Sequence, residues 1–126
     1  MTIVIDMYTN AAKQSHAEAQ YNLGVLYRHG KGVAQDHKQA VTWFRRAANQ
    51  GFADAEYNLG NMYNRGVGVA QDHKLTVKWY LKAANEGHAE AQHNLGVMYH
   101  RGEGVVQDLN LAMTLLRKAA DQGLAN

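Results

Sequence analysis

The sequence contains no cysteine and no proline, and its one serine is Ser15. Without cysteine the chain has no disulfide framework and no thiolate metal site, and the redox compartment stays open, with the cytoplasm as the default. No serine, cysteine or paired-carboxylate arrangement typical of a catalytic centre is found. We therefore expect a non-catalytic protein without a cofactor.

Long apolar runs and a strong charge of one sign are missing too. No wholly apolar run exceeds three residues, whereas a membrane-spanning helix needs about 20. The first residues lack the basic segment and long apolar core of a signal peptide. The net charge is +2, and 13 basic and 11 acidic residues are mixed along the chain. We therefore expect neither a membrane nor a nucleic acid as partner.

What the sequence does have is an internal repeat. The stretch Asn58 to Asp72, NLGNMYNRGVGVAQD, recurs in similar form 36 residues earlier and 36 residues later. Residues 16–51 and 52–87 are identical at 21 of 36 positions, and residues 52–87 and 88–123 are identical at 18. A fixed period of this length indicates a solenoid, in which each unit buries its apolar face against its neighbours. We divide this one domain into a half repeat, three repeats and a tail: 1–15, 16–51, 52–87, 88–123 and 124–126.

Each repeat is predicted to hold two helices, which we name helix A and helix B. In the first repeat, helix A covers about residues 16–29 and ends at Gly30, and helix B covers about 37–50 and ends at Gly51. With the same pattern in the other repeats and one helix B in the half repeat, the prediction is an all-α fold of seven helices.

Two kinds of N-terminal cap are predicted. Asp36 precedes helix B, and Gln39 three residues later would complete a capping box. Ser15 stands three residues before Glu18 and is predicted to cap helix A in the same way.

Glycine inside helix A and aromatic residues in helix B indicate how the helices pack. Gly60 and its counterparts occupy a helix interior, where glycine costs roughly 1 kcal/mol relative to alanine. We therefore predict a close contact at Gly60. Trp79 and Tyr80 alternate with alanines at helical spacing and are predicted to pack over small residues of a neighbouring helix.

These residues together resemble the Sel1-like repeat family, a 36-residue relative of the tetratricopeptide repeat. In the middle repeat the pattern is carried by Ala53, Ala55, Asn58, Leu59, Gly60, Tyr63, Gly66, Gly68, Val69, Gln71, Asp72, Trp79, Tyr80, Ala83, Ala84 and Gly87. The resemblance implies a right-handed α-solenoid of antiparallel helix pairs. It also implies a protein-interaction scaffold or adaptor, of a family common in bacteria, that holds a protein segment on a concave face lined by the A helices.

The chain departs from the family pattern at a few positions. Thr76 stands where the other repeats have alanine, which predicts less tight packing of the middle helix pair. Leu115 and Leu116 replace the aromatic pair, which predicts a looser last helix. The cysteines of some exported family members are absent.

The concave positions of the related tetratricopeptide fold give fifteen candidate partner-binding residues. They are Glu18, Tyr21, Val25, Arg28, His29, Asp54, Tyr57, Asn61, Asn64, Arg65, Glu90, His93, Val97, His100 and Arg101. Across the repeats they form three rows. The acidic row is Glu18, Asp54 and Glu90, and the central row is Tyr21, Tyr57 and His93. The basic row is Arg28, Arg65 and Arg101 with His29 and His100. This pattern predicts a peptide with an acidic group and an aromatic or apolar side chain, with arginine as the anchor for a carboxylate.

Simpler interpretations exist for the same residues. Acidic residues near helix N-termini and basic ones near C-termini are what the helix dipole favours without any ligand. Asn22, Asn58 and Asn94 recur in every repeat and either contact a bound peptide or, more commonly, hold a neighbouring helix.

Glycine and histidine suggest two other chemistries that the spacing does not support. The G-x-G of the loop follows a helix and lacks a third glycine or a Lys-Ser/Thr pair, so no phosphate-binding loop is predicted. The seven histidines form no His-Glu-x-x-His pattern, and we predict no metal site.

The alternative function is a helical-repeat protein that binds single-stranded RNA, because some repeats of similar length read RNA bases. The acidic row and the low net charge argue against it. We also predict end-to-end self-association through two uncapped ends, formed by Ile3, Val4, Met7 and Tyr8 and by Leu115 and Leu116.

Overall fold

The structure is a computed structural model that describes residues 2–123, with side chains from Ile5 onward. Within this range the chain forms seven helices and no strand, so the all-α prediction is confirmed. The helices are α1 (Thr2–Lys13), α2 (Ala17–His29), α3 (His37–Asn49), α4 (Ala53–Arg65), α5 (His73–Asn85), α6 (Ala89–Arg101) and α7 (Leu109–Asp121). None of them has the length and apolar character needed to cross a membrane.

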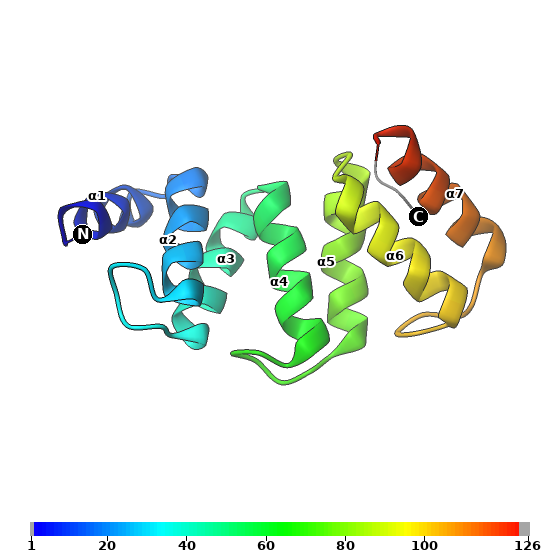
Figure 1. The fold of residues 1–126 in the computed structure, drawn as a ribbon, viewed down its shortest axis with the longest axis horizontal. Helices are drawn as coiled ribbons and strands as arrows, with labels where there is room; N and C mark the ends of the chain where they lie inside the picture. Colours follow the sequence, from blue (N-terminus) through cyan, green and yellow to red (C-terminus); the bar gives the residue numbers. More distant parts are fainter. Residues whose placement is uncertain (1, 124–126) are drawn as a thin grey trace.

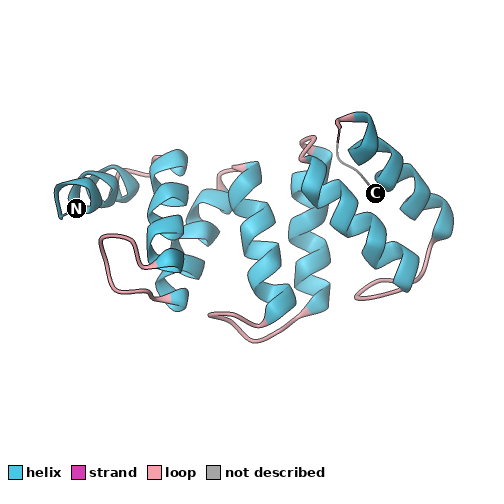
Figure 2. Cartoon of the chain, in the orientation of Figure 1, coloured by secondary structure: helices cyan, strands magenta, loops and turns pink. Residues whose placement is uncertain are grey.

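The helices follow one another along an elongated array, with α1 at one end and α7 at the other (Figure 1). The main contacts are between helices adjacent in the sequence. The pairs α2 and α3, α4 and α5, and α6 and α7 are the helices A and B of the three repeats. The longer loops from helix A to helix B lie along one edge of the array (Figure 2).

The helix ends follow the repeated glycine and aspartate residues. Gly30 ends α2 in the left-handed conformation, with φ of 70°. The Asp36 side chain accepts a hydrogen bond of 3.1 Å from the backbone nitrogen of Gln39 and so caps α3. The predicted second half of this capping box is wrong, because the Asp36 amide instead donates to the carbonyl of Tyr27 at 2.9 Å.

The predicted cap at Ser15 is also wrong. The residue before α2 is His16, and its side chain makes no capping hydrogen bond. Ser15 has a φ of 66°, a left-handed conformation otherwise taken only by glycine in the described residues. It stands 36 residues before Gly51 and therefore occupies the position where a helix B ends.

The glycines inside the A helices are contact points, as predicted. A β-carbon at Gly60 would lie 2.7 Å from Cδ1 of Tyr80, and one at Gly24 would lie 2.7 Å from Cδ1 of Phe44. Real β-carbons do not approach other atoms this closely, so only glycine lets the aromatic ring of helix B lie on helix A.

The tryptophan before that ring packs toward the preceding repeat. Trp79 of α5 belongs to a core cluster with Phe44 of α3 and Leu59 of α4. Trp43 of α3 belongs to a cluster with Ile5 of α1. Each helix B therefore stabilises both its own helix A and the repeat before it.

The departures from the repeat pattern are accommodated. Thr76 is fully buried, and its hydroxyl donates to the carbonyl of Asp72 at 3.0 Å. Leu116 takes the place of Tyr80, with its Cγ 3.0 Å from a β-carbon built at Gly96.

The predicted apolar ends are only partly correct. Leu115 is 8% exposed and packs in the core, so its assignment to an uncapped end is wrong. The apolar residues that α7 exposes are instead Leu109, Leu111 and Met113. At the other end Met7 is 66% exposed, whereas the side chains of Ile3 and Val4 lie outside the described residues.

Candidate functional site

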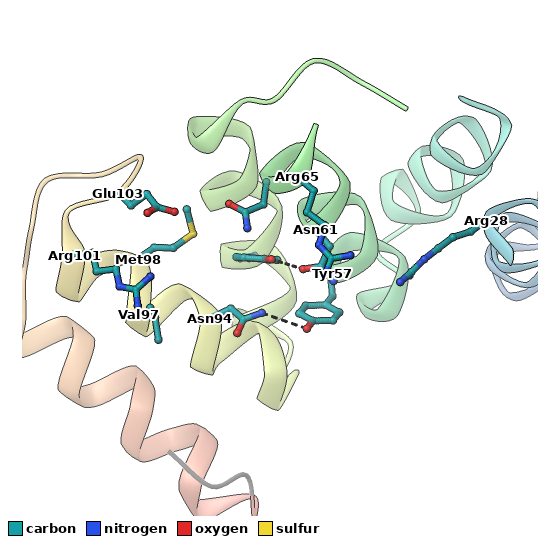
Figure 3. Close-up of a pocket in the computed structure, with 11 residues that line it drawn as sticks. Arg28, Tyr57, Asn61, Arg65, Asn94, Val97, Met98, Arg101 and Glu103 are labelled. Atoms are coloured by element: carbon teal, nitrogen blue, oxygen red, sulfur yellow. Dashed lines mark hydrogen bonds between the residues drawn. The ribbon is translucent and has the colours of Figure 1, made fainter. Parts of the chain in front are cut away.

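A cleft of about 350 Å³ lies among the A helices of the three repeats. Most of its wall comes from α4 and α6, and Arg28 reaches toward it from α2 (Figure 3). Seven of the fifteen predicted residues line it: Arg28, Tyr57, Asn61, Asn64, Arg65, Val97 and Arg101. The cleft thus brings much of the basic row together with Asn61 and Asn64.

Eight predicted residues lie outside this cleft: Glu18, Tyr21, Val25, His29, Asp54, Glu90, His93 and His100. The acidic row is exposed, and Asp54 accepts a hydrogen bond of 3.0 Å from Nε2 of His88 in the next repeat. Glu18 lies beside a separate pocket at the N-terminal end.

Tyr21 and Val25 face neighbouring side chains. Tyr21 packs against the rings of Phe44 and Phe52, at centroid distances of 5.7 and 5.3 Å. Burial raises its pKa, and the carboxylate of Asp54 adds to the increase. Val25 packs against the same apolar core.

The three histidines outside the cleft differ in exposure. His29 and His100 are exposed at the ends of their helices. His93 is half-buried, and its Nδ1 atom is buried without a hydrogen-bond partner.

Four residues of the wall were not among the fifteen candidates: Tyr80, Asn94, Met98 and Glu103. Tyr80 is buried and donates its hydroxyl hydrogen to Oδ1 of Asn61. Burial raises the pKa of Tyr80 to about 12, and the nearby Tyr57 contributes, so the hydroxyl keeps its proton near neutral pH. Asn94 donates to the hydroxyl of Tyr57 at 3.2 Å, and Figure 3 draws both bonds.

A signal for one of these residues was present in the sequence. Glu103 occupies a loop position that holds Lys31 and Val67 in the other repeats. The predicted face consists of helix positions only, so this loop residue lies outside it. Asn94 is the same residue in every repeat, so no variation marks it. Tyr80 and Met98 stand at positions where every repeat has a large apolar or aromatic residue, which indicates packing.

The electrostatic feature of the cleft is a pair of arginines without an acidic partner. Within the described side chains the ion pairs are His73 with Glu103, at 3.9 Å, and His88 with Asp54, at 3.0 Å. Neither Arg65 nor Arg101 takes part in one. Arg28 differs from them, because its Nη1 donates to Oδ1 of Asn58 at 2.6 Å.

Comparison with known proteins identifies the repeat. The family model of the Sel1 repeat matches residues 17–52, 53–88 and 89–124. The chain belongs to the Sel1 repeat family.

Solved structures include similar Sel1 arrays. A protective antigen of uropathogenic Escherichia coli strains is 46% identical, with a TM-score of 0.92, over 95% of this chain and 26% of that one. A Sel1 repeat protein from Oxalobacter formigenes is 36% identical, with a TM-score of 0.90, over 95% of this chain and 49% of that one. The cysteine rich protein B of Helicobacter pylori shares the fold, at 22% identity and a TM-score of 0.74, over 98% and 88% of the two chains. The curated proteins include no match.

The first two of these proteins are longer than the present Sel1 chain, which spans about a quarter of one and about half of the other. Sel1 repeat proteins are generally non-catalytic scaffolds for protein interactions. Among the described residues no three histidine, aspartate or glutamate side chains converge as they would around a metal ion.

The repeated asparagines have a structural role in two of the three Sel1 repeats. Asn58 accepts the bond from Arg28 and donates to the carbonyl of Asp54 at 2.8 Å. Asn94 reaches Tyr57 of the preceding repeat. Asn22 instead lines the pocket at the N-terminal end.

Proposed function

We propose that this Sel1 chain is a non-catalytic interaction module whose cleft binds an extended segment of a partner protein through a carboxylate. The observation that carries the proposal is the pair of guanidinium groups, Arg65 on α4 and Arg101 on α6, which line one cleft and have no acidic partner among the described side chains. An arginine fork binds a carboxylate through two parallel hydrogen bonds.

The rest of the wall suits a peptide. Oδ1 of Asn61 is occupied by the Tyr80 hydroxyl, which leaves the amide hydrogens of Asn61 free to donate to a peptide carbonyl. Val97 and Met98 add an apolar surface beside these polar groups. A volume of about 350 Å³ is at the small end for ligand sites and suits one or two side chains of a longer segment.

Glu103 favours a peptide over a polyanion. Its carboxylate lies in the same wall as the two arginines. A single acidic side chain of a peptide can bind the arginines and avoid Glu103. The closely spaced phosphates of a nucleic acid have less freedom to do so, and like charges brought together weaken binding.

The test is a binding measurement with a library of soluble peptides that carry one Asp or Glu next to an aromatic or apolar residue. The matched library replaces the acid by Asn or Gln. We expect saturable binding to the acidic library only. The Arg65→Glu, Arg101→Glu double variant should lose at least tenfold in affinity, because truncating charge-assisted bonds costs about 2 kcal/mol or more.

The control is a Lys38→Glu, Lys118→Glu double variant, which changes the net charge equally at exposed residues outside the cleft. If both double variants bind the acidic peptides alike, the cleft is not the binding site. Binding of random single-stranded RNA that weakens steeply with salt would instead favour the RNA alternative.

A further inference from the structure

A pocket of about 260 Å³ lies where the first repeat meets the second. Its wall comes from α2, α3, α4 and the loop after α4, and we call it the junction pocket. Arg28, Asn61 and Arg65 line both this pocket and the cleft, so the two spaces adjoin. The other lining residues are His37, Met62 and Val67.

Three residues of the junction pocket carry basic groups, and none of the six is acidic. Arg28 and Arg65 provide guanidinium groups, and His37 provides an imidazole. Within the part of the chain that the structure describes, none of the three forms an ion pair, and the His37 side chain, unlike that of His73, makes no hydrogen bond. The pocket therefore gathers basic groups without a carboxylate to balance them.

The equivalent place between the second and third repeats is occupied by a side chain of the chain itself. His73 is the first residue of α5, as His37 is of α3. Its Nδ1 lies 3.1 Å from Oδ1 of Asn64 and 3.9 Å from Oε1 of Glu103. At this second junction a carboxylate of the chain therefore faces the histidine.

The loops show that the two junctions are built alike. A β-carbon at Gly68 would lie 2.5 Å from the carbonyl oxygen of His37, and one at Gly104 would lie 2.6 Å from that of His73. Each loop thus passes equally close to the first residue of the preceding helix B. The residue before each glycine is consequently held beside the histidine in both junctions.

Two sequence differences separate the junctions. One period before Glu103 the chain has Val67, and one period before Asn64 it has Arg28. The first difference removes a carboxylate, and the second adds a cation. Guanidinium groups bind carboxylates through paired hydrogen bonds. The first junction is therefore suited to a carboxylate that the chain does not supply.

We infer that the junction pocket binds the carboxylate of a second acidic side chain of the partner segment, beside Arg28, His37 and Arg65. The inference rests on the proposed binding of an acidic segment in the cleft, and it adds that this segment carries two acids. The first carboxylate then binds toward Arg101 and the second in the junction pocket, and Arg65 lines both spaces.

The size and the wall of the pocket favour a single glutamate side chain. The volume is below the range of about 300 to 1,000 Å³ that is typical of small-molecule sites. Met62 and Val67 provide apolar surface for the methylene groups of an acidic side chain. The group that meets the histidine at the second junction is also a glutamate carboxylate, that of Glu103.

The test uses two matched sets of soluble peptides, titrated into the full chain. Peptides of the first set carry one Glu beside an aromatic residue and a second Glu after a spacer of variable length. In the second set the second Glu is replaced by Gln. We expect the best spacer to give about threefold to tenfold tighter binding for Glu than for Gln, the effect of a charge-assisted hydrogen bond in a partly exposed site.

Val67→Glu tests the location, because it gives the pocket a carboxylate at the position that Glu103 holds one period later. The variant should bind both peptide sets with equal affinity. Ala70→Glu is the matched control, because it adds the same charge to the same loop at an exposed residue outside both spaces, and it should keep the gain from the second Glu. Circular dichroism checks the fold, since Val67 packs against the core.

A second variant removes a basic group of the pocket. His37 is exposed, and His37→Ala should reduce the gain from the second Glu to less than about twofold. Thr42→Ala, at an exposed residue of the same helix outside the pocket, should leave the gain unchanged.

Three results would overturn the inference alone. The first is a second Glu that adds nothing although the single-acid peptides bind, which leaves the proposed function intact. The second is a gain that persists in both Val67→Glu and His37→Ala, because the second acid would then lie elsewhere. The third is a gain that phosphoserine gives at the second position and Glu does not, because the pocket would then be a phosphate site. If neither peptide set binds, the inference and the proposed function fail together.

Discussion

The middle repeat differs from its two neighbours at one pair of side chains, of which the member on helix A is buried. In the first repeat Gln50 donates to Gln20 at 2.6 Å, and in the third Gln122 donates to Gln92 at 2.7 Å. The side-chain amide of Gln20 in turn donates to the backbone carbonyl of Ala12, and that of Gln92 donates to the backbone carbonyl of Ala84. In the middle repeat both positions are carboxyl groups, Glu56 and Glu86.

Two side-chain amides in this place can form a hydrogen bond with each other, whereas two ionised carboxylates cannot. Glu56 is 3% exposed, and its Oε1 has no hydrogen-bond partner. An ionised carboxylate has no hydrogen to donate to the carbonyl or to the other carboxylate. Burial first, and then the hydrogen bond to Glu86 and the charge of Glu86, raise the pKa of Glu56 to about 8, while Lys82 acts in the opposite direction. The buried side chain of the middle repeat is therefore a protonated carboxyl group near neutral pH, where the neighbouring repeats have an amide.

The largest predicted effect is a pH dependence of stability that belongs to the middle repeat. Between pH 4.5, the ordinary pKa of Glu56, and about 8, its folded value, the folded chain binds more protons than the unfolded chain. The free energy of unfolding should therefore fall as pH rises through this window and level off above it. The fall attributable to Glu56 is on the order of 5 kcal/mol, since the pKa rises from 4.5 to about 8 and one pKa unit corresponds to about 1.4 kcal/mol.

Glu56→Gln should remove this dependence, because it restores the amide of the flanking repeats. Urea denaturation at pH 4.5 and at pH 8.5 measures the effect: little change at the lower pH and a more stable variant at the higher one. Glu90→Gln, which changes an exposed carboxyl group in α6, is the control. Equal pH profiles for wild type and Glu56→Gln would show that Glu56 does not hold the proton.

A smaller difference between repeats is predicted at the glycine under helix B. A β-carbon at Gly60 would lie 2.7 Å from the ring of Tyr80, which is buried and hydrogen-bonded to Asn61. The equivalent atom at Gly96 would lie 3.0 Å from Cγ of the half-buried Leu116 and 3.2 Å from the carbonyl oxygen of Ala112, so its closest contact is milder. The last repeat should therefore tolerate a methyl group that the middle repeat does not.

Gly60→Ala is expected to destabilise the protein by about 1 to 3 kcal/mol, the usual range for overpacking. Gly96→Ala should change stability by less than about 1 kcal/mol, because the higher helix propensity of alanine offsets a milder contact. Thermal denaturation at pH 5, where the Glu56 proton is bound, compares the two. Similar losses in both variants would contradict the packing difference.

The repeat period predicts most of the fold, and the wrong prediction at Ser15 follows from a local pattern that conflicts with the period. Helix ends at Gly30 and Gly51 follow from the glycine positions in the three repeats. The local pattern with Glu18 predicts a cap at Ser15, whereas the place of Ser15 one period before Gly51 marks the end of a helix. In a repeat array the position within the unit outweighs a local signal, because the neighbouring units determine the chain path.

The site is less predictable, because variation in the sequence does not show which way a side chain points. Arg65 and Arg101 line the cleft, but Tyr21 and His93 of the same predicted face do not. Tyr21 packs against Phe52 of the next repeat. The sequence pattern of a single repeat does not predict such a contact between repeats. The pairing of Glu56 with Glu86 lies within one repeat but is equally hidden in the sequence, since the two positions are 30 residues apart and meet only when the repeat folds.

The smallest predicted difference concerns the repeated asparagine. Asn58 is 9% exposed and bonds to Arg28 and to the carbonyl of Asp54, whereas Asn94 is half-buried and donates to Tyr57 alone. Asn58→Ala should cost about 1 to 2 kcal/mol and Asn94→Ala about 0.5 to 1 kcal/mol, measured by urea denaturation.

The same pair of variants connects the repeat comparison to the cleft. Asn58→Ala frees the guanidinium group of Arg28, which already lines the cleft, and should strengthen binding of an acidic peptide there by about twofold to fivefold. Asn94→Ala removes a wall residue without freeing a cation and should not strengthen it. If Asn58→Ala weakens peptide binding instead, Arg28 contributes to the cleft only while Asn58 holds it in place, and the asparagine becomes a positioning residue of the site.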